Sequence, residues 1–178
     1  MSSGTIVIIV VAVVVVIAIV GVAVLGRRRR LQRQFGPEYD RAVAEQGNRM
    51  QAEADLAERQ RRVRKLDIRP LSTAAKARYH AQWQEIQEEF VDAPQTAVTQ
   101  AYDLVTEVMQ ERGYPVTDDE QVADDLSVEH ARTVDHFRTA HAITREVAHG
   151  SVATEDLRQA VIHYRELFSD LLGDATAD

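Results

Sequence analysis

The sequence contains no cysteine, which excludes disulfide bonds, thiolate metal sites, cysteine nucleophiles and lipid attachment to cysteine. Its only asparagine, Asn48, is followed by Arg and Met, so the chain has no acceptor for N-glycosylation. Lysine is scarce: two lysines stand against nineteen arginines, a bias that we attribute to the codon usage of a G+C-rich bacterial genome. The lack of cysteine does not fix a compartment, because such a protein is stable in either redox state.

Motifs that carry catalytic or cofactor chemistry are also missing. The eight glycines are scattered and form no phosphate-binding loop, and no serine has the context of a nucleophile elbow. Adjacent carboxylates at 88–89, 118–119 and 124–125 point to different faces of a helix, which is typical of solvated surface. The sequence therefore predicts no cofactor, no metal site and no catalytic residue.

One long hydrophobic run lies near the N-terminus. Residues 6–25 are Ile, Val, Ala and Leu with one Gly, and as a helix this run spans about 30 Å, the thickness of a bilayer core. A helix in water needs only one apolar face, whereas this one is apolar all round. We predict a transmembrane helix at 5–26, with residues 1–4 outside the cytoplasm.

A cleaved signal peptide is the alternative interpretation of this run. Signal peptides carry Lys or Arg before a shorter run and end at a small-x-small cleavage site. Here residues 1–5 hold no charged side chain, and the run meets Arg27 directly after Gly26. These features favour a retained anchor.

A cluster of five arginines follows the run and predicts its orientation. The cluster consists of Arg27, Arg28, Arg29, Arg30 and Arg33. Burying an Arg in the bilayer costs roughly 2.5–3.5 kcal/mol on insertion scales, whereas each gains about 1 kcal/mol near anionic headgroups. We expect a single-pass protein of the cell membrane, with the arginines against anionic lipid headgroups and the C-terminal domain in the cytoplasm.

Charge is divided unevenly along the rest of the chain. Residues 27–65 hold twelve Lys and Arg against six Asp and Glu, whereas residues 66–178 hold nine against 22. An acidic distal domain argues against nucleic-acid binding, which needs a basic face. The second basic cluster is interpreted as a solvated helix end, with lipid, nucleic acid or an acidic partner as alternatives. It consists of Arg59, Arg61, Arg62, Arg64 and Lys65.

Residues 27–66 are predicted to form a basic juxtamembrane segment and a stalk helix. The sequence FGP at 35–37 breaks the membrane helix, and a helix is expected to restart at Pro37 or Glu38 and run to about Leu66, with a candidate hinge at 47–48. Its apolar stripe is thin, which suggests a stalk or one side of a weak coiled coil and would allow a homo-oligomer. The stripe consists of Tyr39, Val43, Met50, Ala54 and Ala57.

Residues 67–173 are predicted to form an antiparallel bundle of about four main helices, which places the chain in the all-α class. Helices are expected from Ser72 or Thr73 to Asp92, from Pro94 to Gly113, from Thr117 to Leu126, from Ser127 to near Gly150, and from Thr154 onward. The clearest apolar stripe, in the last helix, is Leu157, Val161, Tyr164, Phe168 and Leu171. Residues 174–178 are predicted to be a disordered tail.

Histidine supplies the candidate binding site. His130 and His141 are separated by eleven positions, which puts them on one face of the helix expected there but roughly 16 Å apart. Two histidines on an apolar face are usually hydrogen-bonded core residues. The alternative is a polar ligand pocket that Arg138 or Arg165 and an acid such as Glu129 would complete.

Six short motifs are distinctive. They are 35–40 (FGPEYD), 66–72 (LDIRPLS), 111–116 (ERGYPV), 125–130 (DLSVEH), 138–141 (RTAH) and 163–168 (HYRELF). Over about residues 31–172 they resemble a family of uncharacterised bacterial proteins with one N-terminal membrane span. The family pattern has Pro and Tyr where this chain has Ala131 and Phe137. The resemblance implies a topology and a helical fold, but no reaction.

These observations favour a membrane-tethered interaction or scaffold module with an unknown protein partner. A small-ligand sensor is the alternative, and an enzyme using the same His/Arg pocket is less favoured. The sequence does not identify an activity or a partner.

The orientation can be tested with reporter fusions at the C-terminus. Alkaline phosphatase folds only after export, so its fusion should be inactive in intact cells, because five arginines oppose translocation. A matched β-galactosidase fusion should be active. Phosphatase activity in the periplasm would refute the orientation.

Overall fold

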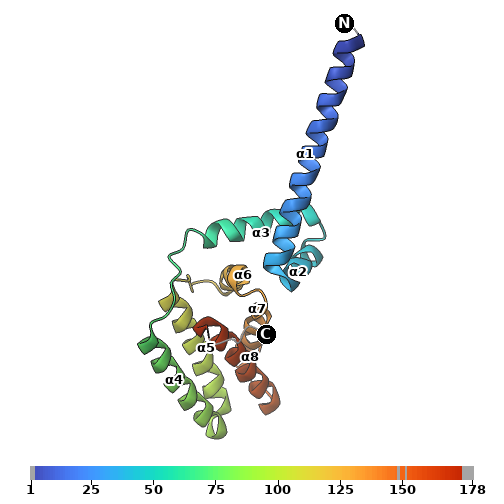
Figure 1. Ribbon diagram of the computed structural model, residues 1–178. Helices are drawn as coiled ribbons and strands as arrows, with labels where there is room; N and C mark the ends of the chain where they lie inside the picture. The colour runs from blue at the N-terminus through green and yellow to red at the C-terminus, as the bar shows by residue number, and fades with distance from the viewer. Residues whose placement is uncertain (1–2, 148, 151, 174–178) are drawn as a thin grey trace. The chain divides into compact units, whose positions relative to one another are not determined.

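The computed structural model describes residues 3–147, 149–150 and 152–173. Over these ranges the chain is all-α, with eight helices, no strand and 83% helical content, as predicted from the sequence (Figure 1). The helices are α1 (Ser3–Phe35), α2 (Pro37–Gln46), α3 (Arg49–Val63), α4 (Thr73–Asp92), α5 (Pro94–Arg112), α6 (Asp119–Glu129), α7 (Val134–Val147) and α8 (Thr154–Leu172). The predicted disordered tail at 174–178 lies outside the described residues.

Two compact units make up the chain, Met1–Ala57 and Glu58–Asp178, and the boundary falls within α3. The first unit contains α1, which is an unbroken helix of 33 residues. From Val11 to Phe35 it is long and apolar enough to cross a membrane. The apolar side chains at 11–25 are exposed, among them Ile17 at 64% and Val22 at 71%, whereas Leu31 and Phe35 near the end of the helix are buried. Signal sequences share this length and composition, so the helix alone does not decide between anchor and signal.

The predicted stalk helix is divided into two helices, α2 and α3, and the break falls at the candidate hinge at 47–48. Gly47 ends α2 in the left-handed conformation, with φ of 62°, and the Asn48 side chain accepts a hydrogen bond from the backbone N–H of Met50 at 2.9 Å. This is the arrangement of a C-cap followed by an N-cap. After the break, the buried face of α3 is not the predicted stripe. Met50, which belongs to that stripe, is 80% exposed, whereas Leu56, which does not, is fully buried.

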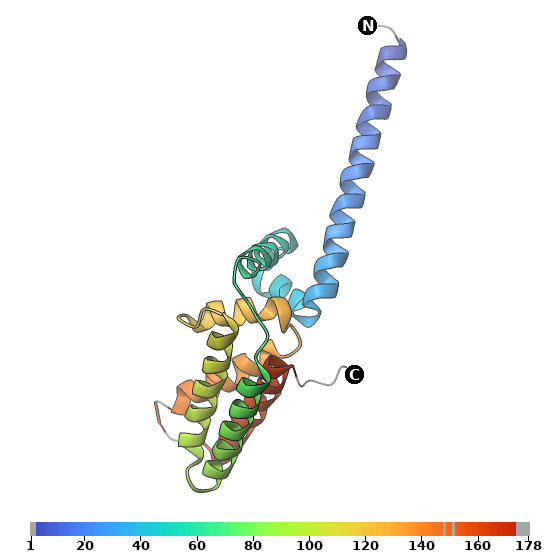
Figure 2. The same cartoon turned by 60° about the vertical axis from the view of Figure 1, so that its left-hand side comes forward.

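The second unit is a bundle in which α4, α5, α7 and α8 are the main helices (Figures 1 and 2). Of the two expected starts of α4, Ser72 and Thr73, Ser72 is the N-cap, since its Oγ accepts a hydrogen bond from Ala75 N at 3.1 Å. α4 and α5 form a hairpin joined at Ala93, with Pro94 at the start of α5, where its missing N–H costs nothing. α5 packs on α8, α8 on α7, and α6 on α7. Their apolar stripes form one shared core. In it Trp83 stacks on Phe168, with 4.9 Å between the ring centroids.

The expected helix from Ser127 to Gly150 is wrong at its start. α6 continues through Ser127 to Glu129, and α7 begins only at Val134. The Ser127 hydroxyl donates to the carbonyl of Asp124 at 2.6 Å, so it satisfies an acceptor inside α6 instead of capping a new helix. The side chain is fully buried. The break lies at residues 130–133, and it separates the two histidines of the predicted pocket.

Gly113 follows α5 at the point where α5 meets the linker between α3 and α4, residues 64–72. Its φ of 101° closes α5 in the left-handed conformation, as the sequence predicts. A Cβ at Gly113 would lie 2.4 Å from the carbonyl oxygen of Asp67. The backbone N–H of Arg69 also donates to the carbonyl of Arg112 at 2.9 Å. The linker backbone therefore packs directly against this turn.

A substitution of Gly113 should be far more damaging than a substitution of another left-handed C-cap in the same unit. Gly113→Ala combines the roughly 1–2 kcal/mol cost of a left-handed Ala with a backbone clash. Gly173→Ala, with φ of 74° and its nearest atom, Lys76 Nζ, at ordinary contact distance, should lose only about 1–2 kcal/mol. Urea denaturation measures both. Equal losses would show that the linker does not pack there.

Candidate functional site

A polar cluster joins the C-terminal ends of three helices of the bundle. Arg112 is in the last turn of α5, His130 follows α6, and Asp170 lies in the last turn of α8. The Arg112 side chain is 14% exposed, and its Nη1 donates to the carbonyl of Leu171 at 3.0 Å. A cation at this position satisfies an acceptor that the helix end leaves unpaired and interacts favourably with the helix dipole.

His130 is held on both ring nitrogens. Its Nδ1 lies 2.8 Å from Asp170 Oδ2, and its Nε2 lies 3.1 Å from Arg112 Nη1. Arginine can only donate hydrogen bonds, so Nε2 of His130 must accept one from Arg112. Nδ1 therefore carries the ring proton and donates a hydrogen bond to Asp170. The Thr133 hydroxyl donates to the same Asp170 oxygen. Because both nitrogens are engaged and the residue is 7% exposed, His130 is a structural hydrogen-bonding group and not an available base.

Burial acts against the charge of Asp170, but its partners outweigh burial. Burial raises the pKa of Asp170, whereas hydrogen bonds from His130 and Thr133 and the charge of Arg112 lower it, and the net pKa is below the usual value. The carboxylate is therefore ionised at neutral pH. Its charge interacts favourably with that of the Arg112 guanidinium, whose ion-pair partner is Glu129.

Tyr114 and Glu129 extend the cluster. The Tyr114 hydroxyl donates to Glu129 Oε2 at 2.9 Å, and the Arg112 guanidinium lies 3.9 Å from the same carboxylate. Burial, followed by the nearby charge of Glu129, raises the pKa of Tyr114 far above its usual value. The phenol therefore stays protonated and acts as a donor at physiological pH.

Two ion pairs attach the C-terminal part of α3 to α6, both within the second unit. Arg59 lies 2.6 Å from Asp124, and Arg62 lies 2.7 Å from Asp125, whose side chain is fully buried. The interpretation of the second basic cluster as a solvated helix end is therefore wrong for these two arginines. Removing one partner of such a buried pair leaves an uncompensated charge.

The structure brings together two of the five residues proposed for a ligand pocket. Glu129 and His130 meet at Arg112. His141 lies on α7, where its Nε2 contacts Asp119 at 3.1 Å. The other two residues are also elsewhere: Arg138 pairs with Asp135 at 3.0 Å, and Arg165 is exposed on α8. The predicted pocket depended on a continuous helix that does not form.

The sequence reasoning missed Arg112, Tyr114 and Asp170. A basic residue in the last turn before a C-cap glycine is a recognisable signal for pairing with helix-end carbonyls, and it could have indicated Arg112. Asp170 has no local signal, because it lies 40 residues from the histidine that it contacts.

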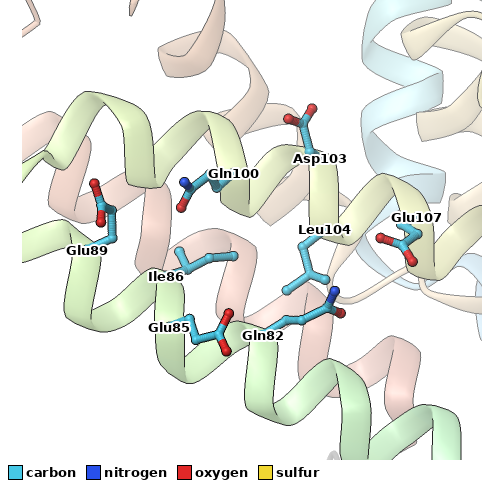
Figure 3. A pocket seen from close by; sticks show the side chains of 8 residues that line it. All are labelled: Gln82, Glu85, Ile86, Glu89, Gln100, Asp103, Leu104 and Glu107. Atoms are coloured by element: carbon cyan, nitrogen blue, oxygen red, sulfur yellow. The ribbon is translucent and has the colours of Figure 1, made fainter.

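A concave surface lies elsewhere, in a groove between α4 and α5 (Figure 3). It has a volume of about 400 Å³. Ile86 and Leu104 lie between the two helices and are nearly buried. The remaining lining residues are two amides and four carboxylates: Gln82, Gln100, Glu85, Glu89, Asp103 and Glu107. Such a lining repels anions and suits a cationic group.

Comparisons with protein-family models, with curated proteins and with solved structures give no match for the chain.

Replacing Asp170 tests whether the polar cluster stabilises the bundle. Asp170→Asn removes a charged acceptor, and we expect a loss of about 1.5–3 kcal/mol at pH 7. The folded pKa of Asp170 is lowered, so this stabilisation is complete above the usual value and is lost as pH falls through the lowered one. Measured by urea denaturation, the difference in free energy of unfolding between Asp170→Asn and the wild type should therefore decrease as the pH is lowered.

Asp156→Asn is the matched control, because Asp156 is an exposed acid in the first turn of the same helix. It should cost no more than about 0.3–1 kcal/mol. If Asp170→Asn has no larger effect than this control at pH 7, the cluster does not hold the helix ends.

Proposed function

We propose that the chain is a membrane-tethered interaction module whose bundle binds a partner protein at the cytoplasmic face of the membrane. The observation that carries the proposal is the sequence of α1, in which an apolar span is followed at once by five arginines. An uncut span of this kind anchors the chain, and the arginines favour a cytoplasmic C-terminal side. The family resemblance implies the same topology.

His130 and Tyr114 are already hydrogen-bonded within the polar cluster, and this supports a role in binding over a role in catalysis. His130 uses both ring nitrogens within the cluster, and the Tyr114 phenol donates to Glu129. A general base needs a lone pair that reaches the substrate, and the ring of His130 has none to offer. The cluster therefore serves to hold three helix ends in register, as a rigid interaction domain requires.

The groove between α4 and α5 supports a partner of particular chemistry. Its four carboxylates come from two helices and surround a small apolar floor. A cationic segment of a partner protein, with an apolar side chain among its basic ones, matches both features. We place the binding surface in this groove.

Photo-crosslinking in native membranes tests this function. A photoreactive amino acid at Gln100, inside the groove, should capture a partner through a peptide of net positive charge. The same amino acid at Arg165, exposed on α8, should not capture it. Adding Glu89→Lys and Glu107→Lys should abolish the capture, because like charges across an interface are repulsive.

Two results would contradict the proposal. Capture that survives both charge reversals would exclude the groove as the binding surface. Recovery of the mature chain in the soluble fraction, cut near Arg27, would exclude the tether.

A further inference from the structure

Two histidines face each other across the α7–α8 interface, away from the polar cluster. The Nδ1 atoms of His136 and His163 lie 2.7 Å apart. Their ring centroids are 5.0 Å apart, with a tilt of 36° between the rings. Both residues are half-buried. At this separation two nitrogen lone pairs repel, so a proton or a cation must lie between them.

We propose that His136 and His163 form a two-histidine site for a divalent first-row transition-metal ion such as Zn²⁺. Imidazole nitrogen is a preferred ligand of these ions. With Zn–N bonds of about 2.0–2.1 Å and tetrahedral angles, two ligand nitrogens lie about 3.3 Å apart. The observed separation is therefore short by about 0.6 Å, which small rotations of the two side chains supply.

Binding of the ion requires that the facing Nδ1 atoms of both histidines carry no proton. A neutral imidazole is the form that binds metal, because the proton and the ion compete for one lone pair. Glu166, one turn further along α8, adds a negative charge nearby that partly balances the ion.

The site has two protein ligands, with water completing the coordination. Within the part of the chain that the structure describes, no group of three or more His, Asp or Glu side chains is placed to hold a metal ion. Structural zinc sites have four protein ligands and catalytic sites three. This site is thus an open one with two protein ligands, and it links α7 to α8 without depending on the proposed binding function.

Titration of the full chain in detergent micelles tests the proposal. ZnCl₂ should bind with one-to-one stoichiometry in calorimetry and raise the Tm, because an ion that binds only the folded state stabilises it. MgCl₂ is the control ion and should do neither, since Mg²⁺ prefers oxygen ligands. His136→Ala and His163→Ala should each weaken Zn²⁺ binding at least tenfold, because each removes half of the chelate.

His149→Ala is the matched control variant, because His149 is exposed beyond the end of α7, and it should bind Zn²⁺ as the wild type does. His163→Gln, checked by circular dichroism, keeps a polar side chain at the interface and covers the case in which the alanine variants unfold. Zn²⁺ binding that persists without both histidines would overturn the site. So would the absence of any Zn²⁺ effect at millimolar concentration, which would mean that the pair is a hydrogen bond only.

Discussion

The bundle depends on a guanidinium that is almost removed from water. A buried cation is tolerated only where its donors find acceptors and its charge finds a counterion. Arg112 meets the first condition at Nη1, which donates to His130 and to the carbonyl of Leu171, whereas its buried Nε has no hydrogen-bond partner. It meets the second condition through Glu129, which lies within ion-pair distance. Since these groups belong to α5, α6 and α8 or directly follow them, the position of one side chain couples three helix ends. Gly113 next to it turns the chain and lets the linker pack closely, so the same end of the bundle also holds the entry to α4.

This constraint explains why the chain leaves the helix after Glu129. His130 can reach both Arg112 and Asp170 only if α6 ends and α7 starts afresh, and the backbone N–H of Val134 returns to the carbonyl of His130 at 2.9 Å. The segment 130–133 is thus shaped by polar pairing and not by its local propensity. A histidine satisfied on both sides stabilises the junction, and for the same reason it is withdrawn from chemistry.

Local signals predicted most of the fold. Ser72, Pro94 and Gly113 act where a cap or a terminator was expected, because each works through its own backbone or its immediate neighbours. The apolar spacing of the last helix predicted most of the buried face of α8 for the same reason.

The candidate site was predicted only in part. His130 and Glu129 could be proposed from composition and position, but their partners lie far along the chain: Asp170 is 40 residues from His130, and Leu171 is 59 from Arg112. Spacing within a helix carries no information on such pairs. The stalk was predicted as one helix with a candidate hinge at 47–48. Gly47 and Asn48 form a complete break at that point, so the predicted apolar stripe does not continue across them in one register.

The two basic clusters, which look alike in sequence, are used differently. In the second, Arg59 is nearly buried and Arg62 pairs with a buried carboxylate, so these charges are already compensated inside the second unit. In the first, Arg27, Arg29, Arg30 and Arg33 are exposed on α1. Attraction to anionic headgroups requires charges that face the lipid and are not neutralised elsewhere. In the proposed topology the first cluster is therefore the one available to anionic headgroups, whereas Arg59 and Arg62 of the second cluster are held by ion pairs to α6.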